Sequence, residues 1–289
     1  MPIILPNIST DNVQTAVNQQ ATPWNTWESP QRLKARYPNG IATLLGIMYT
    51  DGCLSRKSKY TWRFYLGNTS LDIIMAFRAS MMNVFQLHAN QVRIAWKLLD
   101  GKPYYRAIVN SGKCGDIFME KYGTCRTLSY KDKGFGVLYP YARLPFSKQS
   151  NKEQIAEFLR AAFSCDGGVN LYVYKDKKSK SLRHNVFLAC HHPKLQQDYC
   201  DLLKVLGIQP RLLLKDNKIR IEKREDLEKF HEEVHFLDGV NITRHSKYWE
   251  GWEKNTVLQM AIASYGNAKS IFQLPQFLDN DIVRPHGRP

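Results

Sequence analysis

The feature that most constrains this chain is an order of segments that occurs twice along its 289 residues. Two segments with helical spacing of apolar residues, Ile41 to Gly52 and Glu153 to Gly167, both end in Asp-Gly. Their aspartates, Asp51 and Asp166, are 115 residues apart. Each segment is followed by a strand pair, a helix, a hairpin and another helix. Duplication of one structural unit explains this order, so we expect two similar halves.

The elements after each Asp-Gly segment carry matching signals. Apolar spacing predicts a helix at Leu71 to Val84 and its counterpart at Leu195 to Leu206. The dipeptides Asp100-Gly101 and Asp216-Asn217 predict tight hairpin turns. The expected organisation is an N-terminal arm at 1–39, a first repeat at 40–142, a polar linker at 143–151, a second repeat at 152–238 and a C-terminal helical extension at 239–289.

The charge of the chain points to a polyanionic partner. Lys and Arg number 41 against 26 acids, which gives a net charge of +15. The six cysteines are scattered without a CxxC pair, and the adjacent His191 and His192 have no spaced partner, so neither a disulfide framework nor a zinc site is expected. No run of eighteen apolar residues and no export signal stands out. We therefore expect an intracellular protein that does not span a membrane.

The expected strands alternate apolar residues with Arg, Lys, Asn and Tyr, which suit hydrogen bonding to phosphates and base edges. The loop Lys175 to Arg183 adds four lysines, which suit phosphate contacts. The side chains expected to contact nucleic acid are Arg63, Tyr65, Arg93, Lys97, Arg106, Asn170, Tyr172, Tyr174, Lys175, Lys177, Arg183, Lys218 and Arg220.

Asp51 and Asp166 are the candidate chemical groups. A carboxylate in the last turn of a helix meets the negative end of the helix dipole, which disfavours it. Small residues such as Gly46 and Ala161 would let the two helices pack closely and would bring the carboxylates together. A bound cation would relieve both penalties, and oxygen ligands of this kind favour magnesium.

The two Asp-Gly segments also carry a family resemblance. LLGIMYTDG at Leu44 to Gly52 resembles the LAGLIDADG motif, and LRAAFSCDG at Leu159 to Gly167 resembles a diverged second copy. The shared order extends from about Ile41 to Leu237. The resemblance is to single-chain LAGLIDADG homing endonucleases. It implies an α+β fold of two pseudo-symmetric αββαββα halves, with saddle-shaped antiparallel sheets and the two motif helices at the central interface.

The resemblance also implies a site and a substrate. A monomer would hold double-stranded DNA on the saddle and cut both strands, with Mg²⁺ bound by Asp51, Gly52, Asp166 and Gly167; Mn²⁺ or Ca²⁺ could substitute in binding. Tyr49 and Ser164 replace the variable first acid of the motif, which is not a metal ligand.

Basic residues near the metals would complete such a site, and Lys113 and Lys223, each just before the last helix of a half, are the nearest matches by position. Two other functions use the same scaffold. An intron RNA maturase would bind structured RNA, and a DNA-binding regulator would bind its site without cutting. Retention of both aspartates favours the endonuclease, and we expect an intron to encode it.

Overall fold

The computed structural model describes residues 40–125, 128–129, 137–138, 143–175, 180–243, 246 and 248–265. The N-terminal arm and Lys177 lie outside these residues. The first half contains α3 (Gly40–Met48), β1 (Gly52–Ser58), β2 (Thr61–Asn68), α4 (Leu71–Phe85), β3 (Arg93–Leu99), β4 (Lys102–Ser111) and α5 (Gly112–Tyr122). The second contains α6 (Lys152–Asp166), β7 (Gly167–Lys175), β8 (Lys180–Ala189), α7 (Pro193–Val205), β9 (Arg211–Leu213), β10 (Lys218–Ile221) and α8 (Arg224–Lys229), which continues as a π-helix at Phe230–Val234. The αββαββα order therefore occurs twice, as predicted.

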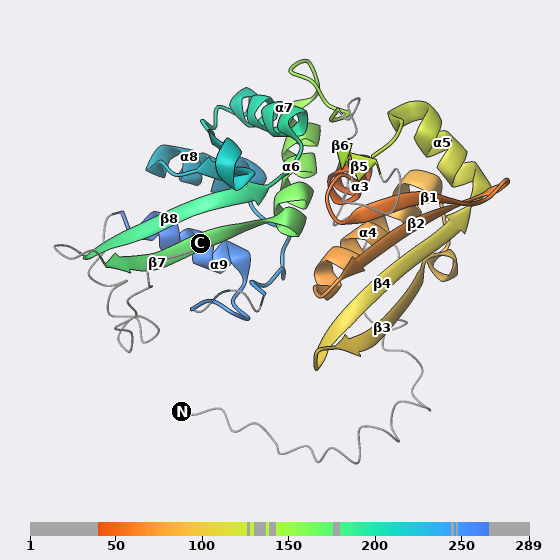
Figure 1. Ribbon diagram of the computed structural model, residues 1–289, viewed down its shortest axis with the longest axis horizontal. Coiled ribbons are helices and arrows are strands. Elements are labelled where there is room, and N and C mark those ends of the chain that lie inside the picture. The colour runs from red at the N-terminus through yellow and green to blue at the C-terminus, as the bar shows by residue number, and fades with distance from the viewer. Residues whose placement is uncertain are drawn as a thin grey trace, which may run out of the picture.

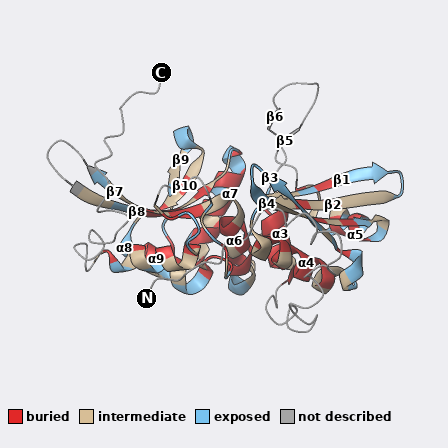
Figure 2. Cartoon of the chain, turned by 90° about the horizontal axis from the view of Figure 1, so that it is seen from below, coloured by how far each residue is buried: buried red, intermediate tan, exposed pale blue. Residues whose placement is uncertain are grey.

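Each half builds one four-stranded antiparallel sheet. The strand orders are β1-β2-β4-β3 and β7-β8-β10-β9, so the corresponding strands occupy corresponding places. The hairpin turns lie where the sequence predicts them, because Asp100, Gly101 and Asn217 all have positive φ. Figure 2 shows helices packed beneath both sheets, with buried residues between the layers and the opposite sheet faces open. This arrangement confirms the α+β fold.

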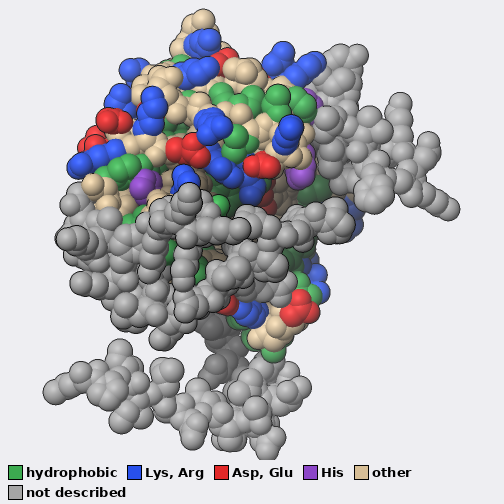
Figure 3. Space-filling model, turned by 60° about the vertical axis from the view of Figure 1, so that its left-hand side comes forward, with side chains coloured by type: hydrophobic (Ala, Val, Ile, Leu, Met, Phe, Trp, Pro, Cys, Tyr) green, Lys and Arg blue, Asp and Glu red, His purple; other side chains and the backbone are tan. Residues whose placement is uncertain are grey.

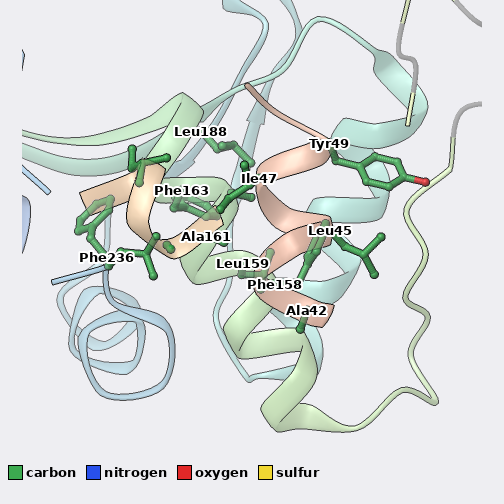
Figure 4. Packing of buried hydrophobic residues seen from close by; sticks show 14 of the residues in the cluster. Ala42, Leu45, Ile47, Tyr49, Phe158, Leu159, Ala161, Phe163, Leu188 and Phe236 are labelled. Carbon is green, nitrogen blue, oxygen red and sulfur yellow. The ribbon is translucent and has the colours of Figure 1, made fainter. Parts of the chain in front are cut away.

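The two halves meet through α3 and α6, which lie side by side at the centre of the molecule (Figure 1). Gly46 and Ala161 occupy the same place in the two halves and face each other, since a Cβ added at Gly46 would lie 2.7 Å from the Ala161 Cβ and 2.5 Å from the Phe158 carbonyl oxygen. Apolar side chains including Leu45 and Phe163 fill the surrounding contact (Figure 4). Close packing through small residues therefore places a pseudo-twofold axis between these helices.

One buried polar contact crosses the same interface. The Thr43 hydroxyl on α3 donates a 2.7 Å hydrogen bond to a carboxylate oxygen of Glu157 on α6. The other oxygen of Glu157 accepts from Arg160 at 2.6 Å. Both oxygens of a nearly fully buried carboxylate are thus satisfied, as burial of a charge requires.

The C-terminal extension packs on the second half. Its helix α9 (Lys254–Ala263) contacts β7 and β8 through Val257, Leu258 and Ala261, which are fully buried. The indole N–H of Trp249 donates to the Leu171 carbonyl of β7. Among the residues described, no helix has the length and apolar character needed to cross a membrane.

Candidate active site at the paired carboxylates

The ends of α3 and α6 bring Asp51 and Asp166 into direct contact, and their carboxyl groups share a hydrogen bond. Asp166 is the last residue of α6. Asp51 differs from the prediction: α3 ends at Met48, so Asp51 lies in the turn between α3 and β1 rather than in the last helical turn. The two aspartates occupy equivalent positions of the repeat and meet on the pseudo-twofold axis.

Burial and mutual repulsion make this pair hard to ionise. Burial raises the pKa of Asp51, although a 2.7 Å hydrogen bond from the Asn68 amide partly offsets the rise. Burial and the neighbouring Asp51 charge raise the pKa of Asp166 from 3.8 to about 7. Two carboxyl groups at this range therefore hold a proton between them near neutral pH in the absence of another cation.

A second equivalent pair lies directly beside the carboxylates. The thiol of Cys165 hydrogen-bonds Thr50, and burial raises the pKa of that thiol well above its usual value. The Thr50 hydroxyl itself donates to the Gly46 carbonyl oxygen at 2.8 Å. The thiol is thus a neutral, packed group beneath the pair.

The glycines that follow the aspartates are needed for space. A Cβ on Gly52 would lie 2.7 Å from the Met48 Cα, and one on Gly167 would lie 2.6 Å from the Phe163 carbonyl oxygen. Both residues begin the first strand of their sheet, so each Asp-Gly pair turns the chain from the motif helix into the sheet. The predicted metal-binding role of Gly52 and Gly167 stays a prediction.

The open sheet faces collect the predicted nucleic-acid contacts. In the first sheet the strand register places five of them on the face opposite the core: Arg63, Tyr65, Arg93, Lys97 and Arg106. In the second sheet the corresponding face carries Asn170, Tyr172, Tyr174, Arg183, Lys218 and Arg220. The side chains of Lys175 and Lys177 lie outside the described part of the chain. Figure 3 shows Lys and Arg spread over the described surface of the second half.

Acidic side chains offset part of the positive charge on the open face of the second sheet. Arg220 lies 3.6 Å from both Asp216 and Glu222, and Arg211 lies 3.5 Å from Glu222. A hollow of about 510 Å³ opens on this face beside Tyr172. This region presents both donors and acceptors, which suits contacts with base edges as well as phosphates.

The structure does not bring Lys113 and Lys223 to the carboxylates. Gly52, which follows Asp51, pairs with Leu66 of β2 and so marks the level of the carboxylates. Ser111, two residues before Lys113, pairs with Trp62 of the same strand. Four residues of strand separate these levels, or about 13 Å at about 3.3 Å per residue. Lys113 is exposed on α5, beyond that level.

Lys223 is likewise displaced from the centre. The carboxylates lie at the level where Gly167 pairs with Leu188. Ile221 pairs with Val186, two residues further along β8 from that level. Lys223 lies two residues beyond Ile221, where it is exposed and occupies the N-cap position of α8. In each half the last strand, β4 or β10, runs away from the carboxylates before the last helix begins. The predictions that Lys113 and Lys223 lie near the carboxylates are therefore wrong.

Strand register instead identifies Arg106 and Lys218 as the basic residues nearest that level. In the first sheet Leu66 pairs with Gly52, and the next residue, Gly67, pairs with Arg106. In the second sheet Leu188 pairs with Gly167, and the next residue, Ala189, pairs with Lys218. The two cations therefore occupy equivalent positions, each one residue from the level at which an Asp-Gly turn enters its sheet.

The first of these positions is closely packed. The hydroxyls of Tyr104 and Tyr65 hydrogen-bond each other over Gly67, where a Cβ would lie 2.0 Å from the Tyr104 oxygen. Both the Arg106 and the Asp51 charges act on Tyr104, which places the three groups in one cluster. The alternation pattern assigned Arg106 to nucleic-acid contact; only the register reveals its nearness to the carboxylate.

Sequence patterns did not single out Lys254, which is buried in the same centre. Its ammonium group donates to the Ser164 carbonyl oxygen at 2.7 Å and to the Gly167 carbonyl oxygen at 2.8 Å. Burial lowers its pKa to about 8, while Asp51 and Asp166 oppose the decrease. Lys254 lies in the extension, outside both repeats, so comparison of the repeats could not find it.

The donor set at the centre fits a hard divalent cation. Two carboxylates held in contact are oxygen ligands of the kind that Mg²⁺, Mn²⁺ and Ca²⁺ use. Within the described residues no three His, Cys, Asp or Glu side chains gather as a complete metal centre. A cation here would therefore need water or substrate oxygens to fill its coordination sphere, as Mg²⁺ commonly does.

The fold and this centre define a class: proteins of two αββαββα units joined through helices that each lead into a shared acidic pair. Residues 153–235 match the profile of the family described as LAGLIDADG-like domain. The second half is thus similar to the LAGLIDADG-like domains, which confirms the resemblance that its sequence shows.

Solved structures of homing endonucleases are similar to this chain. One described under mesophilic variants of the homing endonuclease I-DmoI is 17% identical, covers 69% of this chain and 97% of its own, and has a TM-score of 0.44. I-DmoI in complex with DNA and Ca is 18% identical, with coverages of 67% and 88% and a TM-score of 0.43. A lysine-to-alanine mutant of I-SmaMI is 11% identical, with coverages of 82% and 93% and a TM-score of 0.47. No curated protein sequence matches the chain significantly.

Proposed function

We propose that this chain is a monomeric, site-specific DNA endonuclease that makes Mg²⁺-dependent double-strand cuts and is encoded within an intron. The observation that carries the proposal is the contact between Asp51 and Asp166 at the junction of two basic sheet faces. One acid from each half gives a cutting centre for each DNA strand, which a single-strand nuclease would not need.

Different groups of residues have different roles in this reaction. The sheet faces bind the duplex, Arg and Lys neutralise phosphates, and Tyr and Asn contact base edges. Asp51 and Asp166 would hold the divalent cation, which would supply activation of water and stabilisation of charge on the scissile phosphate. Arg106 and Lys218 each place a positive charge on the face where one phosphate would lie, so they stabilise the additional negative charge that develops there.

Single substitutions test the carboxylate assignment. Asp51→Asn and Asp166→Asn should each abolish double-strand cutting in Mg²⁺ and leave DNA binding in Ca²⁺ within about threefold. The matched control is Asp201→Asn, which removes a carboxylate from the surface of α7 and should cut normally. Normal cutting by either active-site variant would refute the metal assignment.

The target sequence can be found by selection from random DNA. Purified protein is incubated with a randomised duplex library in Mg²⁺, and the cut ends are sequenced; if the reading frame lies in an intron, the joined flanking exons serve as a defined substrate. Recovery of one long site supports the endonuclease. Selective duplex binding without nicking in Mg²⁺ or Mn²⁺ would instead identify a regulator, and preference for intron RNA would identify a maturase.

A further inference from the structure

Lys254 is placed where neither helix formation nor solvation favours a lysine. It is the first residue of α9, where the positive end of the helix dipole disfavours a cation. Its side chain is also buried, with 7% of the residue exposed, although lysine is rarely buried without a partner. Some interaction at the centre must therefore offset both costs.

The contacts of its ammonium group identify that interaction. The carbonyl oxygens of Ser164 and Gly167, which accept its hydrogen bonds, lie on either side of Asp166 in sequence. The Ser164 carbonyl belongs to the C-terminal turn of α6, where the helix dipole favours a cation. The ammonium thus fastens both chain segments that lead into and out of Asp166.

The same ammonium group acts on the carboxylates by charge. It lies close enough to Asp51 and Asp166 to favour the ionised form of each. It is also 5.4 Å from the centre of the Phe236 ring, whose face adds a further favourable contact for a cation. In a buried site, where the effective dielectric is low, one fixed positive charge strongly changes the field that any other cation meets.

We propose that Lys254 is a positioning residue that serves as a built-in counter-cation for the Asp51–Asp166 pair, so that the C-terminal extension sets the affinity of the pair for divalent metal. This inference deepens the proposed function and rests on its metal site. Lys254 offsets part of the charge of the pair when metal is absent, and it opposes the metal electrostatically when metal binds. Its removal should therefore tighten metal binding, the opposite of what loss of an ordinary structural anchor would cause.

Two substitutions separate charge from hydrogen bonding at this position. Lys254→Met removes the charge and the N–H donors, whereas Lys254→Gln removes the charge and keeps N–H donors for the carbonyl oxygens. Lys254→Arg keeps the charge, and the adjoining cavity of about 490 Å³, which Lys254 helps to line, gives the larger side chain room. The matched control is Asn255→Ala, which removes two hydrogen bonds between α9 and Phe236 without touching the end of α6.

The measurement is Mn²⁺ binding to the full-length protein without DNA, followed by electron paramagnetic resonance, after circular dichroism has shown that each variant is folded. Lys254→Met and Lys254→Gln should bind Mn²⁺ on the order of tenfold more tightly than the wild type, while Lys254→Arg and Asn255→Ala should stay within about threefold. If the first two variants bind Mn²⁺ with unchanged or weaker affinity, the counter-cation proposal is overturned. The Gln variant decides the matter if the Met variant does not fold.

The same measurement distinguishes this inference from the proposed function. Asp51→Asn should remove the high-affinity Mn²⁺ signal of the wild type, which shows that the signal comes from the carboxylate pair. A wild-type protein that binds no Mn²⁺ would contradict the metal site itself, and the inference would fall with it. A wild type that binds Mn²⁺ at the pair, together with unaltered Lys254 variants, would overturn the role of Lys254 alone.

Discussion

Thr43 on α3 and Glu157 on α6 are joined by a 2.7 Å hydrogen bond inside an interface that is built largely from apolar and small residues. These two residues do not occupy equivalent positions. The counterpart of Thr43 in the second half is Phe158, and the counterpart of Glu157 in the first half is Ala42. The hydrogen bond therefore breaks the symmetry that Gly46 and Ala161 keep a turn further along.

Removal of the Thr43 hydroxyl should destabilise the protein through this contact. Thr43→Val keeps the shape and leaves a buried carboxylate oxygen without its donor, which should lower the free energy of unfolding by about 1–3 kcal/mol. Urea unfolding followed by circular dichroism measures the change, and Thr43→Ser, which keeps the hydroxyl, should remain closer to the wild type. Equal stability of Val and wild type would show that the hydrogen bond contributes little.

The close approach of α3 and α6 predicts a stronger effect at Gly46. In Gly46→Ala the new methyl group would meet the Phe158 carbonyl oxygen and the Ala161 side chain, so the helices must separate. We expect a loss of about 1–3 kcal/mol in stability and a roughly hundredfold loss of cutting rate, because the carboxylates move apart. The control is Gly101→Ala, whose Cβ would meet nothing within 4 Å and whose positive φ affects only a distant hairpin.

Stability should depend on pH through Asp166. The pKa of this group is about 7 in the folded protein and 3.8 in an ordinary environment, so the folded state binds the proton more tightly than the unfolded state. Without metal, the free energy of unfolding should therefore fall as pH rises from about 4 through about 7. Comparison with Asp166→Asn isolates this contribution, and Mg²⁺, which competes with the proton, should reduce it. A pH dependence identical in the two proteins would contradict the assignment.

The basic residues assigned by strand register can be tested against those assigned by sequence position. Arg106→Met and Lys218→Met should each slow single-turnover cutting, by roughly 10- to 100-fold, and each should affect one strand more than the other. Denaturing gels with differently labelled strands measure both rates. Lys113→Met and Lys223→Met should cut within about threefold of the wild type; a larger effect at these exposed positions would reverse the correction.

The sequence predicted those parts of the molecule that local periodicity and repetition determine. The order of elements in both halves follows from apolar spacing, and the hairpin turns follow from Asp100-Gly101 and Asp216-Asn217. Alternation along the strands placed the basic side chains on the open faces, because neighbouring residues of a strand point to opposite sides. The pairing of Asp51 with Asp166 followed from their equivalent positions in a repeat.

The parts that the sequence missed depend on contacts between distant segments. The distance of Lys113 from Asp51 depends on strand direction and register, which adjacency in the sequence does not reveal. Lys254 belongs to no repeat and reaches the centre only because α9 packs under the second sheet. The early end of α3 at Met48 depends on how the Asp-Gly turn enters β1. Tertiary packing overrides local signals in each case.

The hydrogen bond between Thr43 and Glu157 also has a consequence for assembly. Two copies of the second half, docked through their motif helices, would set each Glu157 against the bulky ring of Phe158 rather than against a hydroxyl. Two copies of the first half would set each Thr43 against the methyl group of Ala42. The two halves of this chain are therefore complementary partners rather than interchangeable ones.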